Sequence, residues 1–414
     1  MDEESLRRLL DGALAHEPPM GPVAQRSLRA GIRLRRRRRA RNTIAGMAAV
    51  AAIACTVPAI SGALSHVPAG HVPKDQKATV YVVSLGPPGT VTPISGATNR
   101  AGKPITVSQG AGAAIVTGNG KTLYVSSDST PGWVIPVTVA SGVLGQPIRA
   151  GDVPREMAAT PDGKTVYVIN LGSNTMTPIG TATNRAARPI RVGIRPQAVL
   201  VAPGGKTAYV LNDGRGRGSV TPIDIATGTA GKPIQVGQSP RVMVMTPDGK
   251  TIYVANLGSG TVTPVSTATD TAGQPIKVGS QPSIIAITPD GKTVYVATGM
   301  HTVTPIATAS NTAGPPIRVG NETSAIAITP DGKTAYVTNY ASDTVTPIAT
   351  RTNRAGKPIR VGAGPIAIAI TPDGRTAYVA SLGAATVTPI SIPANTPGRA
   401  IKVAKRPWAM AIAR

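Results

Sequence analysis

"TPDGKTAYVTN", residues 329–339, decides the fold, because close copies of this stretch recur along most of the chain. Each copy contains a Tyr-Val pair, and successive pairs stand about 42 residues apart. The pairs begin at Tyr81, Tyr124, Tyr167, Tyr209, Tyr253, Tyr295, Tyr336 and Tyr378. A period of this length indicates a repeat architecture in which each copy is one supersecondary unit.

One unit, residues 323–362, predicts four short strands. "TSAIAIT", "TAYVTN", "TVTPIAT" and "PIRVG" are the strand segments, and "PDGK", "YASD" and "RTNRAGK" are the turns between them. Four period-two segments are the pattern of a four-stranded antiparallel sheet. Such a sheet cannot bury both faces alone, whereas copies that stack around an axis can. We therefore expect an all-β chain that forms a β-propeller of eight blades; seven blades are the alternative if one divergent unit folds differently.

The repeated "TPDG" predicts the turn between the first and second strands. Pro stands second, Asp third and Gly fourth, which are the preferences of a type I turn. Tyr336 and Val337 follow on the second strand and point to opposite faces of the sheet, so each is expected to pack against a neighbouring blade. Pro in "TVTPI" and "GKPI" fits the outer part of a blade, because Pro cannot donate to a strand ladder.

The two ends of the repeat region complement each other. The region begins at "TVYVVS", a second strand without a first strand before it, and ends at "RPWAMAIAR", a first strand without a second. Residues 408–413 are therefore expected to complete the first blade. This arrangement closes the ring through the C-terminal strand and gives the propeller domain the bounds 78–414.

These repeats resemble the YVTN-family β-propellers, named for the tetrapeptide at residues 336–339. The resemblance covers about residues 78–414 and rests on "TPDGKTxYV", "TVTPI" and "GKPIxVG" recurring together. It implies kinship with bacterial surface or secreted proteins, archaeal surface-layer components or lactonase-type propellers. Many members have seven blades, so eight departs from the commonest form.

A membrane span is predicted ahead of the propeller. Residues 42–64, "NTIAGMAAVAAIACTVPAISGAL", lack charge over 23 positions, and a helix of that length crosses a bilayer core. The Arg cluster at residues 33–41 favours a cytoplasmic N-terminus, which places the propeller outside the plasma membrane as a single-pass protein. Residues 1–41 then form a basic cytoplasmic segment with a short amphipathic helix, and residues 65–77 form a linker.

Other interpretations of this region stay open. The apolar run could be a cleavable signal peptide, although some 41 residues precede it. "AAIAC", ending at Cys55, loosely resembles a lipobox, and a poly-Arg run can also bind nucleic acid, although its place beside an apolar stretch favours the membrane. Residues 1–41 also resemble the intracellular ends of actinobacterial membrane proteins, some of them anti-sigma regulators, which would make the propeller a sensor; the His16 there has no Cys beside it.

Charge points to an anionic partner. The formal net charge is +24, of which residues 1–41 supply eleven Arg against five acids, so most of the excess lies in the repeat region. Propeller ligands usually sit on the face formed by the loops before the first strand and between the second and third. Those loops supply the candidate ligand-binding residues Arg155, Glu156, Arg195, Arg241, Arg215, Arg217, Glu322, Lys405, Arg406 and Trp408. The stretch "NDGRGRGS", residues 212–219, is longer than its counterparts.

Catalysis has little support in the repeats. Residues 78–414 contain one His, His301, no Cys and two Glu, Glu156 and Glu322, and a lactonase needs acids, His or metal ligands that converge. We expect no catalytic residues, no metal and no cofactor. The preferred function is a membrane-tethered, extracellular, non-catalytic binding or scaffold module for an anionic cell-envelope polymer or a protein partner. The alternatives are a lactonase-like hydrolase and an extracellular sensor.

Overall fold

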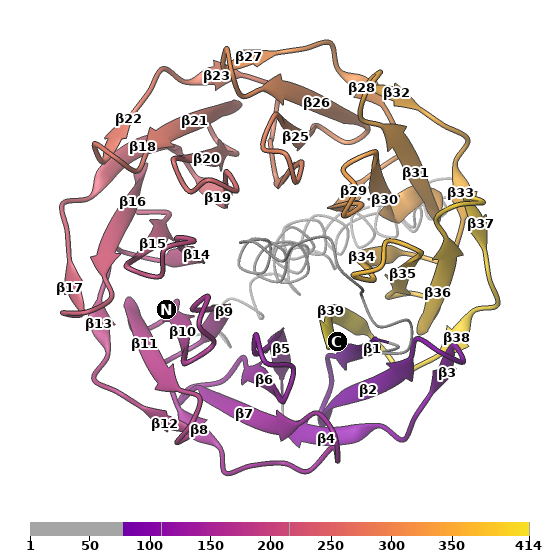
Figure 1. Cartoon of the computed structure of the whole chain (residues 1–414), viewed down its shortest axis with the longest axis horizontal. Coiled ribbons are helices and arrows are strands. Elements are labelled where there is room, and N and C mark those ends of the chain that lie inside the picture. Colours follow the sequence, from indigo (N-terminus) through magenta and orange to yellow (C-terminus); the bar gives the residue numbers. More distant parts are fainter. Residues whose placement is uncertain (1–77, 109, 215, 414) are drawn as a thin grey trace, which may run out of the picture. The chain divides into compact units, whose positions relative to one another are not determined.

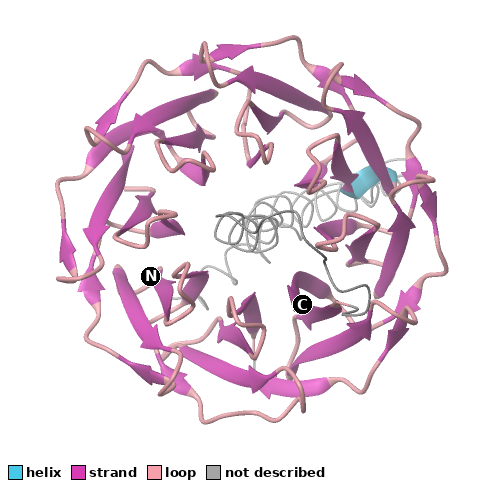
Figure 2. Ribbon diagram, viewed as in Figure 1, coloured by secondary structure: helices cyan, strands magenta, loops and turns pink. Residues whose placement is uncertain are grey.

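The repeats form a closed ring of antiparallel sheets (Figure 1, Figure 2). The computed structural model describes residues 78–108, 110–214 and 216–413, and these fold into eight sheets arranged as the blades of a β-propeller. This confirms the predicted fold class and the count of eight blades over seven. The predicted cytoplasmic segment 1–41, span 42–64 and linker 65–77 lie outside the described residues. Within the described ranges, no helix is long and apolar enough to cross a membrane.

Each blade has its first strand nearest the axis and its second strand next to it. The first strands, from blade 1 to blade 8, are β39 (Pro407–Ala413), β5 (Ala111–Val116), β9 (Pro154–Ala159), β14 (Pro196–Val201), β19 (Pro240–Met245), β24 (Ile284–Ile287), β29 (Thr323–Ile328) and β34 (Pro365–Ile370). The second strands are β1 (Thr79–Ser84), β6 (Thr122–Ser127), β10 (Thr165–Asn170), β15 (Thr207–Asn212), β20 (Thr251–Asn256), β25 (Thr293–Thr298), β30 (Thr334–Asn339) and β35 (Thr376–Ser381). All eight second strands are buried after their first residue.

The third strands and the outer segments complete the blades. The third strands are β2 (Gly89–Ser95), β7 (Trp133–Thr138), β11 (Thr175–Gly180), β16 (Arg217–Asp224), β21 (Thr261–Ser266), β26 (Thr302–Ala307), β31 (Thr344–Ala349) and β36 (Thr386–Ser391). The outer segments are β3 (Arg100–Ala101) and β4 (Ile105–Ser108), β8 (Ile148–Arg149), β12 (Arg185–Ala186) and β13 (Ile190–Arg191), β17 (Thr229–Ala230) and β18 (Ile234–Gln238), β22 (Thr271–Ala272) and β23 (Ile276–Lys277), β27 (Thr312–Ala313) and β28 (Ile317–Arg318), β32 (Arg354–Ala355) and β33 (Ile359–Arg360), and β37 (Thr396–Pro397) and β38 (Ile401–Lys402).

The fourth strand differs from the prediction, because in seven blades it is split into two short segments that both pair with the third strand. In blade 7 the first segment starts at Arg354, inside the stretch "RTNRAGK" that was predicted to be a turn. Pro347 of β31 explains the split. Its carbonyl accepts a hydrogen bond from the Gly356 N–H on the outer side, so its nitrogen faces the same side without a proton to donate, and the ladder breaks there.

The ring closes as the sequence predicts. β39 pairs with β1 in antiparallel register, from Thr79 opposite Ala413 to Ser84 opposite Pro407, and so supplies the first strand of blade 1. The strand begins at Pro407, one residue before the predicted 408–413. In Figure 1 the indigo β1 lies beside the yellow β39, which joins the two ends of the repeat region in one sheet.

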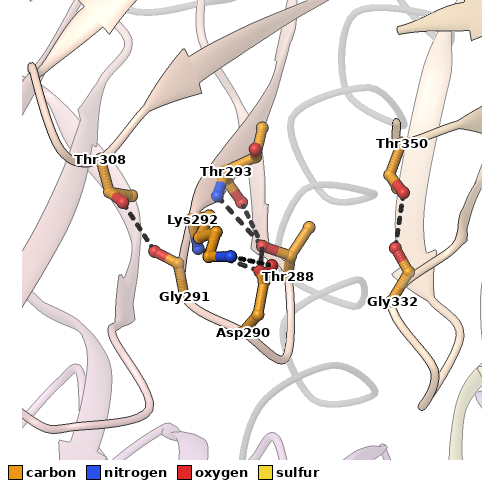
Figure 3. A network of polar contacts seen from close by, with 8 residues as sticks. All are labelled: Thr288, Asp290, Gly291, Lys292, Thr293, Thr308, Gly332 and Thr350. Carbon is orange, nitrogen blue, oxygen red and sulfur yellow. Dashed lines mark hydrogen bonds and ion pairs between the residues drawn. The ribbon is translucent and has the colours of Figure 1, made fainter. Parts of the chain in front are cut away.

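The turn that opens the motif is held by its own side chains (Figure 3). In blade 6 the Thr288 hydroxyl donates to Asp290 Oδ1 over 2.6 Å, and the Lys292 N–H donates to the same oxygen over 3.0 Å. The Thr293 N–H in turn donates to Thr288 Oγ1. The repetition of "TPDGKT" within this chain is therefore explained by the hydrogen-bond network that these residues form in the turn.

The repeated Tyr ties most blades to the next. Tyr336 is fully buried, and its hydroxyl donates to Asn395 Oδ1 in blade 8 over 2.6 Å. Tyr295 donates to Asn353 in the same way, and both Asn have positive φ near 53°, a region that Asn tolerates better than most residues. The predicted structural role of the Tyr is thus confirmed, and in five blades an Asn in the turn after a third strand is its acceptor.

Candidate functional site

Three consecutive backbone positions at the start of the first strands set the directions of the candidate side chains. A residue with positive φ comes first, as at Arg195 (55°) and Glu322 (54°), and Pro usually follows it. The next residue lies in a β-bulge, where the first strand carries one residue more than its partner: Pro240 pairs with Asn256 but Val242 pairs with Ala255, which leaves Arg241 unpaired. Bulges of this kind re-aim a side chain, and here they lie at the start of the innermost strand in seven blades, with blade 6 as the exception.

Blades 3 and 5 bring basic side chains to this bulge. Arg155 in β9 and Arg241 in β19 occupy equivalent positions, and Gln197 occupies the same position in the blade between them. Arg155 and Arg241 are half-buried, whereas Gln197 is buried and donates to the Arg195 carbonyl over 3.2 Å. The predicted residues Arg155, Arg195 and Arg241 therefore come from three consecutive blades.

Arg195 is fixed by its neighbours on both sides. Its backbone N–H donates to Asn174 Oδ1 of blade 3 over 2.7 Å, and its carbonyl accepts from the Asp213 N–H. Its guanidinium forms an ion pair with Asp213 at 3.4 Å, in which the Asp213 side chain is 16% exposed and that of Arg195 is 57% exposed. Much of the Arg195 guanidinium thus remains open to solvent.

The three arginines interact electrostatically. Burial lowers the pKa of Arg155, Asp128 and Glu156 oppose that lowering, and the positive charges of Arg241 and Arg195 add to it. Arg155 and Arg241 occupy equivalent bulge positions and Arg195 directly precedes the first strand of the blade between them, so the three residues lie at the same end of the ring. Within the described residues, Arg155 Nε is buried without a hydrogen-bond acceptor. The protein therefore leaves positive charge at this cluster incompletely compensated, a condition that favours binding of an anion.

Glu156 does not face the same way as Arg155. It is buried, with 6% of its surface exposed, and accepts a hydrogen bond from the Val199 backbone N–H in β14 of the next blade. Burial raises the pKa of Glu156 well above its usual range, more than Arg155 and the Val199 hydrogen bond lower it. The residue therefore acts between two blades rather than on the open face.

The other predicted residues lie apart from this cluster. Glu322 belongs to blade 7, and Lys405 and Arg406 are exposed before β39 in blade 1. Trp408 holds the same bulge position as Arg155, but it is only 8% exposed and packs in a cluster with Ala111 and Ile366. It therefore lies in the core and not on an exposed rim. Arg217 is exposed at the start of β16, and Arg215 lies outside the described residues.

Acidic and metal-binding chemistry is sparse on this part of the chain. Among residues 78–413, leaving out 109 and 215, no group of three or more His, Cys, Asp and Glu side chains comes together. Glu156 and Glu322, the acids that a hydrolase would need, lie on different blades. Asp128, after β6 in blade 2, acts on Arg155 together with Glu156: burial raises the pKa of Asp128, and Arg155 lowers it.

Comparison with known proteins shows the fold. No protein-family model and no curated protein matches the chain. Among solved structures, the dihydro-heme d1 dehydrogenase NirN is similar with a TM-score of 0.70 and 16% identity, over 86% of this chain and 78% of that one. AztD from Citrobacter koseri gives 0.65 and 12%, over 82% and 98%. Hydrazine synthase from Kuenenia stuttgartiensis gives 0.57 and 22%, over 67% and 94%. At these identities the chain shares with the three proteins the β-propeller architecture.

Proposed function

We propose that the propeller is a non-catalytic module that binds an acidic polymer of the cell envelope through Arg155, Arg195 and Arg241. The observation that supports this proposal is the placement of three arginines at or beside the same position of consecutive blades, with Arg155 Nε buried without an acceptor among the described residues and Arg195 largely exposed. Guanidinium groups bind carboxylates and phosphates through paired, charge-assisted hydrogen bonds. A polyanion would relieve the repulsion that the protein leaves in place.

Salt-dependent binding tests this function. Polygalacturonate serves as the acidic probe for the full-length chain, and binding should weaken as ionic strength rises, because salt screens exposed charge. Changing Arg155, Arg195 and Arg241 together to Gln should lower the affinity at least about tenfold.

A matched control removes the same charge elsewhere. Arg100, Arg185 and Arg354 are exposed on outer segments of blades 1, 3 and 7, and their joint change to Gln should leave the affinity within about twofold. An equal loss of affinity in both triple variants would show that net charge alone drives binding and would contradict the proposed site.

The proposal includes the membrane tether and the kinship with YVTN-type propellers. The support for the tether is the uncharged stretch 42–64 behind an Arg cluster, and the support for the kinship is the repeated "TPDGKTxYV". Protease added to intact cells should cleave or release the propeller while residues 1–41 stay protected. Protection of the propeller until the cells are lysed would contradict the topology.

A further inference from the structure

A groove of mixed polar and apolar lining lies on the seam between blades 4 and 5. It has a volume of about 280 Å³ and lies between β18 of blade 4 and β21 of blade 5. Its polar lining side chains are Arg217, Gln235, Gln238, Ser259, Thr261 and Thr263. The remainder of the lining is Val236, Gly237, Ala272, Gly273 and Pro275.

Two long strands of blade 4 border this groove. β16 has eight residues, and Arg217 at its start pairs with Gln238 at the end of β18, which runs for five residues where most blades have two. The outer strand of blade 4 thereby reaches the next blade, against which it packs. The Gln238 N–H donates to Ser259 Oγ across the seam over 2.7 Å.

Described residues close to the groove also contact the arginine cluster. Asp213 pairs with Arg195, and the Gly214 N–H donates to the Ile194 carbonyl over 3.0 Å. Gly218, next to Arg217 of the groove, lies so close to Pro240 that an added Cβ would stand 2.2 Å from the Pro240 Cγ. Because Arg241 directly follows Pro240, the groove lies beside the arginine cluster.

The lining favours one ligand class. Carboxamides and hydroxyls match the hydroxyl groups of a sugar, because both partners donate and accept, whereas Arg217 matches a carboxylate. A uronic acid carries both kinds of group on one ring. Simple polyphosphate would use the arginine but leave the amides and hydroxyls without suitable donors to accept from.

We infer that the ligand is an acidic polysaccharide that extends from the arginine cluster past Pro240 and places a further uronate unit in the blade 4–blade 5 groove, against Arg217 and Gln235. This inference rests on the proposed function and adds a second subsite to it. Two linked subsites bind a long chain more tightly than a short one, because the second contact is made within one complex.

Galacturonate oligomers of defined length test the second subsite on the full-length chain. The dodecamer should bind at least about tenfold more tightly than the trimer. Arg217→Gln should lower dodecamer affinity about threefold or more and leave trimer affinity unchanged. Arg360→Gln, an equal charge change on the exposed outer segment of blade 7, is the matched control and should change neither.

Two outcomes overturn the inference while the proposed function survives. One is equal binding of trimer and dodecamer, both still dependent on Arg155, Arg195 and Arg241. The other is an equal effect of Arg217→Gln on the two lengths. If the trimer does not depend on the arginine cluster, the proposed function itself fails.

A polyphosphate of twelve units separates the ligand classes. Gln235→Leu should weaken binding of the dodecagalacturonate and leave binding of polyphosphate unchanged, because only the sugar has hydroxyls for the carboxamide. If Gln235→Leu weakens the binding of both ligands, or of neither, the assignment of the groove to a saccharide would be overturned.

Discussion

At the scale of the residue, Glu156 is a carboxyl group in a place where the other blades have apolar side chains. The equivalent positions in blades 4 and 5 are Ala198 and Val242, and both are buried. Glu156 has a backbone N–H as partner, but burial dominates and raises its pKa. The folded protein therefore holds the proton more tightly than the unfolded chain does, where the pKa of Glu is about 4.3.

We expect Glu156→Gln to stabilise the protein at neutral pH and not at low pH. As pH rises above about 4, the unfolded chain gains stability by ionising, whereas the folded state must keep the proton or bury a charge. The wild-type protein thus loses stability as pH rises, until the pH passes the raised pKa of Glu156 in the folded state. The Gln variant does not lose this stability, because its side chain does not ionise and still accepts from the Val199 N–H. Thermal unfolding of both proteins at pH 4 and pH 8 should give a difference only at pH 8, of roughly 1–3 kcal/mol. A variant less stable than wild type at pH 8 would contradict this.

At the scale of the element, the "TPDGK" turn shows the opposite pH behaviour. The Thr288 hydroxyl, and to a lesser extent the Lys292 N–H and charge, lower the pKa of Asp290. A carboxyl with a lowered pKa stabilises the fold above its unfolded pKa, and that contribution is lost as pH falls through the folded value. Blade 2 provides a natural comparison, because Asn119 accepts the same two hydrogen bonds there from Thr117 and the Lys121 N–H without a charge.

Substitution at Asp290 separates the hydrogen bonds from the charge. Asp290→Ala should destabilise the protein by about 0.5–1 kcal/mol at pH 7, because the Thr288 hydroxyl and the Lys292 N–H lose their acceptor in a partly exposed turn. Asp290→Asn should cost less, as the blade 2 turn indicates, and should remove this turn's dependence on pH below about 4. Denaturant unfolding at pH 7 and pH 3 measures both effects. Equal losses for Ala and Asn would show that the charge, not the network, holds the turn.

The elements also show where prediction from sequence stops. The first three strands of each blade follow from period-two alternation and turn residues, and the structure places them as predicted. The fourth strand differs from the prediction. It breaks because the Pro347 nitrogen faces the outer side of the third strand, and the side that this nitrogen faces is set by the pairing register, which the sequence does not show. The Tyr-Asn contacts were likewise not predicted, since Tyr336 and Asn395 meet only when neighbouring blades stack.

At the scale of the whole molecule, the repeat register predicts which residues share one end of the ring but not how deep each side chain lies. Arg155 and Trp408 hold the same bulge position, yet one is half-buried beside other arginines and the other packs in the core. The difference comes from the neighbouring blades, which offer charged groups to Arg155 and apolar ones to Trp408. The arginine cluster could therefore be proposed from the sequence. Which of the candidate residues belong to it could be decided only from the packing of neighbouring blades in the structure.

Ring closure is the property of the whole chain that a single change tests best. Deleting residues 407–414 removes the first strand of blade 1, with the buried Trp408 and Met410, and exposes the paired edge of β1. We expect a loss of more than about 4 kcal/mol and fast amide hydrogen exchange throughout β1. The control moves the strand instead of deleting it: residues 407–412 followed by "TPDGK" are inserted before Thr79, because Ile412 stands opposite Val80 as Ile328 stands opposite Ala335 in blade 7. This variant has all strands of blade 1 in sequence and should recover both stability and protection in β1. Slow exchange in β1 after the simple deletion would show that the C-terminal strand does not hold the ring closed.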